Sequence, residues 1–434
     1  MKVLQLSFLM LLAIFTSAGL RAQSDSVMHF SLSEAQDYAI SNFHLSKNAE
    51  LDIKSAKWKI WETTAIGLPQ VSASGSYQRI PGSLPPPFPI NDSVMVSLYQ
   101  KSNTQYGVTV NQLIFSGEYI VGLQASKVYK SLSETNYEKV RLDIKENVAG
   151  TYYTILVLES NKTIVEQTIS NLKSSLEQTQ KIYNAGLIED VDVDQISLTV
   201  KQTESQLTSL NNQIQYMQSL LKYQLGLDIN TEVELTEKLE GLVNRNIVDT
   251  LSLNFILEDN VDYQLLSTQE KLQKLNKRRE ISKYLPTLSG YYNYVENTNA
   301  PDFPPPVKNY IGLNLSFSIF ESGSRIAKIQ QAKIAQIEAE NTKNQEGQRL
   351  VIAAQQARWD YEAALDVYMN ELENYELSKK VYEKTEEKYQ KGLVSSLDLT
   401  IINNQFLQAH MSYTQASLNL LNANVSLNKA YNKL

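Results

Sequence analysis

Acidic side chains beside two Gly-Leu pairs are the residues of this chain with the clearest capacity for chemistry. Asp190, Asp192 and Asp194 alternate shortly after the first pair, Gly186-Leu187. Carboxylates at this density could bind a metal ion. The first turn of a helix also attracts acidic residues to its dipole, so we favour helix capping over a metal site.

The other reactive residue types point to no catalytic chemistry. The histidines, His29, His44 and His410, lie far apart and lack the spacing of metal ligands. The chain has no cysteine, which excludes a disulfide framework and a cysteine-based zinc site. No nucleophile, pair of acids or phosphate-binding loop stands out. We therefore expect no enzyme, no catalytic residue, no metal and no cofactor.

Residues 1–22 have the pattern of a secretory signal peptide. Lys2 precedes an apolar run from Val3 to Ala18, and we expect cleavage after Ala22, or alternatively after Ala18. A membrane anchor is the competing interpretation, but the run is shorter than the roughly 20 residues that a spanning helix needs. The net charge of −7 gives no reason to expect a nucleic-acid partner.

The rest of the chain repeats one layout. Gly117 and Gly186 lie 69 positions apart, and Gly323 and Gly392 have the same spacing. A repeat of about 206 residues is far too long for a solenoid unit. We therefore expect a first structural repeat, an equatorial connector and a second repeat, at residues 23–226, 227–250 and 251–434.

Two stretches in each repeat alternate between apolar and small polar residues, as β-strands do. In the last stretch, Ile311, Leu313 and Leu315 alternate with polar or glycine residues. Strands that are apolar on one face and polar on the other are typical of a membrane β-barrel, although a soluble sandwich remains the alternative. The four strands are expected at about residues 70–80, 104–115, 287–296 and 310–320.

A long helix should follow each pair of strands. Segments 117–185 and 323–391 contain no proline, and as helices they would be about 100 Å long at 1.5 Å per residue. Tyrosines at seven-residue intervals from Tyr361 to Tyr389 predict a left-handed coiled coil in the second segment. The first segment echoes this pattern with aliphatic residues, but polar residues such as Thr179 interrupt it.

Shorter helices should complete each repeat. Gly186 and Gly392 can adopt the left-handed conformation that ends a helix, so the chain should turn back there into a return helix of about 60 Å. Another helix is expected before each strand pair, over residues 31–68 and 251–285. A return helix and this shorter helix, stacked end to end, would match the long helix in length.

Four strands cannot close a barrel, and open sheet edges are not tolerated in lipid. The chain must therefore take further strands from copies of itself. Two copies would give eight strands, whose interior is filled by side chains. Three copies give twelve strands, a size within the range of bacterial barrels, so we expect a homotrimer.

These features together resemble the TolC-like outer membrane efflux proteins. The resemblance rests on the helix stops Leu68-Pro69 and Leu285-Pro286, on the two Phe-Ser-Gly-like strand exits, and on the two Tyr-x-x-Gly-Leu turns. It implies a mainly α fold with a membrane β-barrel part. Two internal repeats of helix, β-hairpin, long helix and helix form this channel-tunnel, with a 12-stranded and a 12-helix barrel in the trimer.

The resemblance also implies a function. Such a protein is a passive exit duct in the bacterial outer membrane, in contact with its lipids, and extends into the periplasm. Its partners are a periplasmic adaptor (membrane fusion) protein and an inner-membrane pump of the RND, ABC or MFS type. The cargo is small molecules, such as drugs, toxic compounds or metal ions, or polypeptides. An exported structural or adhesive coiled-coil surface protein is the alternative, but it leaves the strands unexplained.

The resemblance further suggests a periplasmic gate. Tyr389 and Asp192 match a tyrosine and an aspartate that bond between helices in the closed state, and Asp398 matches an aspartate that forms a ring in the trimer. The family arginine two residues after the second glycine is Val394 here, so that closing link is absent or replaced. Ile401 stands in place of a second ring aspartate. We therefore expect a single carboxylate ring with a preference for cations.

The two turns at the helix tips have a separate implied role. By the resemblance, Gly186, Leu187, Gly392 and Leu393 are the tips at which the adaptor docks. A turn that is merely structural is the alternative interpretation.

Overall fold

The computed structural model describes residues 27–91, 94–97, 99–245, 254–298 and 307–434. The expected signal peptide therefore lies outside the described residues. The chain divides into two compact units. The first consists of Met1–Phe43, Asn147–Asn246 and Asn370–Leu418, and the second of His44–Glu146, Ile247–Met369 and Asn419–Leu434.

Helices dominate the described residues. In chain order they are α2 (Leu32–Asn42), α3 (His44–Ala65), α4 (Gly117–Asn184), α5 (Asp190–Leu225), α6 (Leu239–Arg245), α7 (Val261–Ser282), α8 (Ser324–Gln390) and α9 (Ser396–Ala430), with a 3₁₀ turn at Leu257–Asp259. The two long helices expected from the absence of proline are α4, with 68 residues, and α8, with 67. Within the described part of the chain, none of these helices has both the length and the apolar character needed to cross a membrane.

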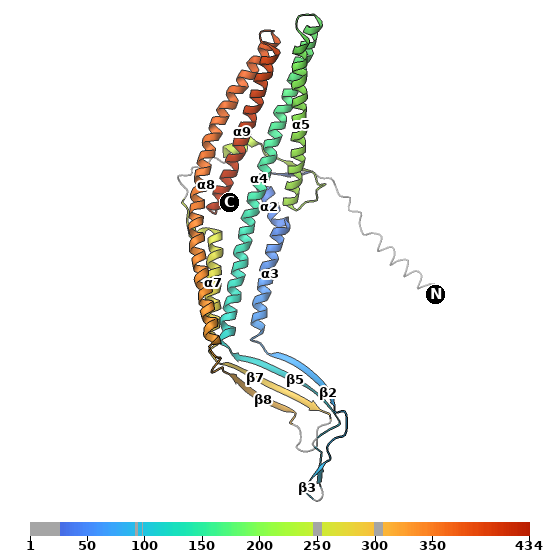
Figure 1. Ribbon diagram of the computed structural model, residues 1–434, viewed down its shortest axis with the longest axis vertical. Helices are drawn as coiled ribbons and strands as arrows, with labels where there is room; N and C mark the ends of the chain where they lie inside the picture. Colours follow the sequence, from blue (N-terminus) through green and yellow to red (C-terminus); the bar gives the residue numbers. More distant parts are fainter. Residues whose placement is uncertain (1–26, 92–93, 98, 246–253, 299–306) are drawn as a thin grey trace, which may run out of the picture. The chain divides into compact units, whose positions relative to one another are not determined.

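The four expected strands form one antiparallel sheet. They are β2 (Gln70–Arg79), β5 (Ser102–Phe115), β7 (Thr287–Asn297) and β8 (Asn309–Ser316), in the order β2-β5-β7-β8 (Figure 1). The central pairing of β5 with β7 joins the two repeats. Within the described residues, β2 and β8 are edge strands, each paired on one side only. Two small sheets pair β1 (Met28–Phe30) with β6 (Val233–Leu235) and β3 (Phe88–Asn91) with β4 (Val94–Val96).

The last strand is shorter than the sequence suggests. β8 ends at Ser316, before the expected end near residue 320. Ser322 and Gly323 have φ angles of 51° and 81°, and this left-handed backbone turns the chain into α8. The alternating pattern continues to Ile319, but that side chain is 89% exposed outside the sheet.

The helix expected over residues 31–68 is in fact two helices. Its capping box is present, since the backbone N–H of Ser31 donates to the Glu34 carboxylate at 2.8 Å. The helix breaks at Phe43, whose ψ angle is 135°. At this break Asn42 and Phe43 receive the end of α5: a Cβ on Gly226 would lie 2.8 Å from the Asn42 carbonyl oxygen. The end of α5, the return helix of the first repeat, therefore packs against this break.

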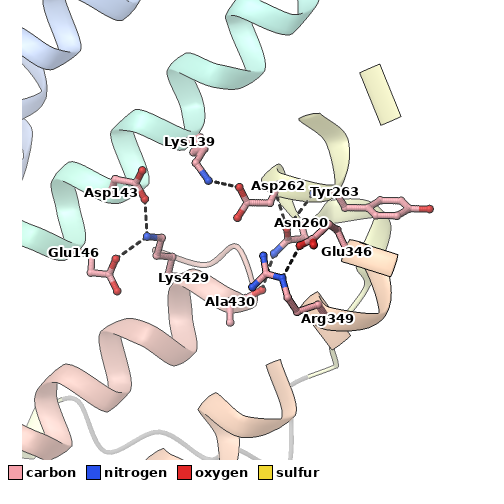
Figure 2. Close-up of polar contacts among 10 residues, drawn as sticks. All are labelled: Lys139, Asp143, Glu146, Asn260, Asp262, Tyr263, Glu346, Arg349, Lys429 and Ala430. Atoms are coloured by element: carbon pink, nitrogen blue, oxygen red, sulfur yellow. Dashed lines mark hydrogen bonds and ion pairs between the residues drawn. The ribbon is translucent and has the colours of Figure 1, made fainter. Parts of the chain in front are cut away.

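The second repeat joins its helices through an asparagine. The expected start near residue 251 lies outside the described residues, and α7 begins only at Val261. The side-chain oxygen of Asn260 accepts bonds from the backbone N–H groups of Asp262 and Tyr263, at 3.0 and 3.3 Å. Its side-chain nitrogen donates to the Ala430 carbonyl at 3.2 Å (Figure 2). One side chain thus caps the start of α7 and the end of α9.

Ion pairs hold the end of α9 against α4. The half-buried Lys429 ammonium donates to Asp143 at 2.5 Å and to Glu146 at 2.6 Å (Figure 2). Burial by itself would lower the pKa of Lys429, but its hydrogen bonds and charge interactions with these two carboxylates raise the pKa overall. A further pair, Lys139 with Asp262, connects α4 to the first turn of α7. Both ends that meet at Asn260 are therefore tied to α4.

The tyrosine repeat of α8 packs as a seam. Tyr361, Tyr368 and Tyr382 are buried. The Tyr382 ring stacks on Phe406 of α9, with ring centres 4.8 Å apart, and Tyr375 stacks on Tyr413 at 5.1 Å. Aliphatic residues of α4 and α5 complete this core of the first unit. The seven-residue spacing therefore reflects packing along the helix.

The contact at Gly226 should be more sensitive to substitution than a turn glycine of equal backbone geometry. Gly226 and Gly186 have φ angles of 71° and 75°, but only Gly226 has atoms within 4 Å of the position that a Cβ would take. Alanine at either position costs about 1–2 kcal/mol because of the left-handed backbone. Gly226→Ala should lose more, because its Cβ would collide with the Asn42 carbonyl. Thermal unfolding followed by circular dichroism compares the two variants, and equal losses would contradict the close approach.

Candidate functional site

Both long helices end in the same backbone motif. Gly186 and Gly392 have φ angles of 75° and 71°. In the first turn the N–H groups of Gly186 and Leu187 donate to the carbonyls of Tyr183 and Ile182, at 2.8 and 3.2 Å. The second turn has the same two bonds at 2.8 and 2.9 Å. This is the Schellman pattern, which needs a left-handed residue and so favours glycine.

The leucines of these turns point into solvent. Leu187 is 75% exposed and Leu393 is 69% exposed. In a Schellman motif the residue after the glycine often packs against a residue in the last turn of the helix. In the second turn that residue is Lys388, which offers Leu393 little apolar surface. Two exposed leucines at equivalent tips are available for contact with another protein.

Asp398 closes a capping box at the start of α9. Its carboxylate accepts from the backbone N–H and the hydroxyl of Ser395, at 3.2 and 2.7 Å. In return, the backbone N–H of Asp398 donates to the Ser395 hydroxyl at 3.1 Å. The Ser395 side chain, and then its backbone N–H, hold the pKa of Asp398 below its ordinary value. The carboxylate is therefore fixed in place and charged, yet exposed to solvent.

Asp192 connects the two return helices. It lies in the first turn of α5 and accepts a hydrogen bond from the hydroxyl of Ser396, a buried residue at the start of α9. Further along the same helices the hydroxyls of Thr199 and Thr400 lie 3.4 Å apart. Ser396 could not be singled out from the sequence, because nothing in its neighbourhood distinguishes it from an ordinary first-turn serine.

Tyr389 connects the two long helices. Its hydroxyl and that of Thr179 on α4 share a hydrogen bond of 2.5 Å. Burial raises the pKa of Tyr389, and the negative charge of Asp192 raises it further. The hydrogen bond with Thr179 acts in the opposite direction but does not cancel these effects. Thr179 is one of the polar residues that interrupt the aliphatic pattern of α4, so this interruption could have predicted a polar partner for Tyr389. The hydrogen bond of Tyr389 thus goes to Thr179, while Asp192 bonds Ser396.

The remaining predicted residues make no further site. Asp190 and Asp194 are exposed, Val394 is half-buried, and Ile401 is 45% exposed. Among the residues that the structure describes, no three His, Cys, Asp or Glu side chains are grouped as metal ligands would be. Asp190 and Asp192 lie in the first turn of α5, where acidic residues complement the helix dipole.

His410 is a buried polar residue without the spacing of a metal ligand. It lies on α9, only 4% exposed, and neither ring nitrogen has a hydrogen-bond partner among the described residues. Its ring lies 5.1 Å from the ring of Tyr375 and borders a cavity of about 500 Å³ that Glu159, Glu237, Lys238 and Glu240 also line. Burial lowers the pKa of His410 to about 4, against the effect of the nearby Ser160 carbonyl.

Comparison with known proteins identifies the fold and the family. A family model described as outer membrane efflux protein matches residues 37–226 and 264–433. No curated protein sequence compared with the chain matches it.

Several solved structures share the fold. The Campylobacter jejuni CmeC outer membrane channel has a TM-score of 0.77 at 18% identity, over 92% of this chain and 85% of that one. The Vibrio cholerae outer membrane protein VceC has a TM-score of 0.72 at 15% identity, over 92% and 95%. The open state of the Neisseria gonorrhoeae MtrE outer membrane channel has a TM-score of 0.70 at 15% identity, over 92% and 88%.

Buried His410 should make the protein less stable in mild acid. Its pKa is about 4 in the folded protein and about 6.5 when unfolded. The unfolded state therefore binds the extra proton first, and stability falls as the pH drops from about 6.5 to 4, by up to about 3 kcal/mol. Denaturant unfolding at a series of pH values should show a weaker dependence in His410→Phe.

The matched control is His29→Phe, which makes the same substitution at an exposed histidine. An identical profile for wild type and His410→Phe would show that the ring does not stay neutral in the fold.

Proposed function

The chain belongs to the outer membrane efflux protein family, and on that premise we propose which of its residues close the channel and meet its partners. As a member it is an outer membrane channel that extends into the periplasm, the passive exit duct of a tripartite export system. Channels of this family form trimers and work with a periplasmic adaptor and an inner-membrane pump. The family is one of channels, and the alternative of a structural or adhesive surface protein finds no support.

The observation that carries this function is the family match across both repeats, strands included. The sheet has the physical properties of part of a membrane barrel. Its outward face carries apolar residues, and its edge strands β2 and β8 have free backbone groups that lipid cannot satisfy. Strands from two further copies satisfy them in a closed barrel.

We also propose a signal peptide over 1–22, repeats over 23–226 and 251–434, and a connector over 227–250.

Two hydroxyl contacts form the proposed closing link at the periplasmic end. Tyr389 with Thr179 joins α8 to α4, and Asp192 with Ser396 joins α5 to α9. Each contact ties helices of different repeats, so the tips cannot move apart without breaking one of them. They take the place of the family arginine, which is Val394 here. Asp398, held by Ser395, supplies the single carboxylate ring of the trimer.

The exposed leucines support adaptor docking at the tips. Leu187 and Leu393 stand beside Gly186 and Gly392 on turns that the backbone fixes. An apolar side chain on a rigid turn suits a helical hairpin of an adaptor. The pump that this adaptor connects, of the RND, ABC or MFS type, selects the cargo, which is small molecules or polypeptides.

Removing the closing contacts should increase leakage through the closed channel. Tyr389→Phe combined with Ser396→Ala deletes both hydroxyls, and we expect a several-fold rise in conductance of the purified trimer in planar bilayers. Tyr382→Phe is the control, because it makes the same change in the same seam of α8. If the double variant conducted like wild type, these contacts would not be the gate.

The proposed carboxylate ring predicts ion selectivity. Asp398→Asn should lower the cation preference measured as a reversal potential in a salt gradient. Ser395→Ala should lose about 1 kcal/mol of capping stability but keep the preference, because the carboxylate remains. An unchanged reversal potential in Asp398→Asn would contradict the ring.

A further inference from the structure

The register of the sheet assigns each strand residue to one of two faces. Val71 pairs with Val110, Val110 with Tyr292, and Tyr292 with Ile311, so these lie on one face. That face is apolar, and Val71, Ile311 and Leu313 are 69%, 84% and 71% exposed in the single chain. In a membrane barrel the apolar face contacts lipid and the opposite face lines the lumen.

The luminal face carries no charged residue. It consists of every second residue in four ranges: Gln70 to Gln78, Asn103 to Leu113, Ser289 to Asn297 and Tyr310 to Ser316. These residues are serine, threonine, asparagine, glutamine, glycine and tyrosine, with one valine and one leucine. Asp, Glu, Lys and Arg do not occur among them.

The sheet does contain charges, but they lie on the other face. Arg79 and Glu296 share the face of the apolar residues, near the ends of their strands. Lys308 donates to Glu296 at 2.7 Å. Charges at the ends of lipid-facing strands can reach the polar headgroup region. The uncharged lumen is therefore a property of one face of the sheet.

Hydrogen-bonding groups and aromatic rings take the place of charges on this face. The Thr109 hydroxyl donates to the Asn293 side-chain oxygen across the β5–β7 pairing. The Tyr291 ring lies over Gly312, where an added Cβ would come within 2.6 Å of it, and meets Tyr310 edge-on at 6.2 Å. Amides and hydroxyls both donate and accept hydrogen bonds, so they can serve a solute of either charge or of none.

We propose that the barrel section of the duct passes solutes without selecting them by charge, through a lumen of amides, hydroxyls and tyrosines. This section admits polar and amphiphilic molecules, whether neutral, cationic or anionic, and the cation preference of the duct arises at the Asp398 ring. Rings of fixed charge are what give a pore its ionic preference, and this barrel section has none. The inference rests on the proposed function, because the lumen exists only if copies of the chain close the sheet into a barrel.

Single cysteines can test this directly, because the chain has no cysteine of its own. Ser72→Cys is luminal, and its neighbour Ala73→Cys faces lipid. The purified trimer in lipid nanodiscs is treated with a cationic and an anionic methanethiosulfonate of similar size. Ser72→Cys should react and Ala73→Cys should not. The ratio of the two rates, relative to a free thiol, should stay within about threefold of one at low and high salt.

A positive control shows that the assay detects charge. Ser72, Thr109 and Asn293 lie at one level of the sheet, and Asn293→Asp keeps the oxygen that accepts from Thr109. Added to Ser72→Cys, it should favour the cationic reagent by about tenfold or more at low salt.

The possible failures are distinguishable. A preference of that size in Ser72→Cys alone would overturn the charge-neutral lumen and leave the channel function intact. Equal reactivity of Ser72→Cys and Ala73→Cys would show that the two faces are not lumen and lipid. That result would overturn the barrel, and the inference with it.

Discussion

The backbone groups along the open edges of a four-stranded sheet are the constraint on which the rest of this structure depends. Within lipid, the N–H and C=O groups of β2 and β8 have no water to bond, and each unpaired group is costly. One chain has two such edges and cannot close on itself with four strands. Copies of the chain must therefore complete the sheet. Trimer formation, the lumen and the passage through it all follow from this requirement.

The long helices impose a second constraint, because helices as long as α4 and α8 need packing partners along their length. In each repeat two shorter helices meet end to end, and the two repeats use different residues at this junction. In the first repeat, a left-handed glycine at 226 lets α5 approach the break at Asn42 and Phe43. In the second, Asn260 bonds the ends of both helices, and Lys429 is held by two carboxylates of α4. Different residues form the junction at equivalent positions of the two repeats. This indicates that the fold requires the junction and not one particular set of residues.

Features set by local pattern could be predicted from the sequence. The missing prolines indicated α4 and α8, the glycines indicated their ends, and the alternating residues indicated all four strands. Features that depend on contacts between distant segments could not. The break at Phe43 lies against Gly226, which is far away in the sequence. The early end of β8 was missed for another reason, because the alternating pattern continues past Ser316 to Ile319. At the candidate site, Tyr389, Asp192 and Asp398 were proposed from the resemblance and stay predictions. The hydrogen bonds of Tyr389 to Thr179 and of Asp192 to Ser396 join residues more than 200 positions apart, so they could be seen only in the fold.

The central claim is that three copies of this chain close one barrel. The mass of the intact protein in mild detergent tests this most directly, and the absence of cysteine means that no disulfide can hold copies together artificially. A single species with the mass of three chains is the result predicted by the open edges of β2 and β8 together with the trimers that this family forms. A stable monomer or dimer would contradict the account.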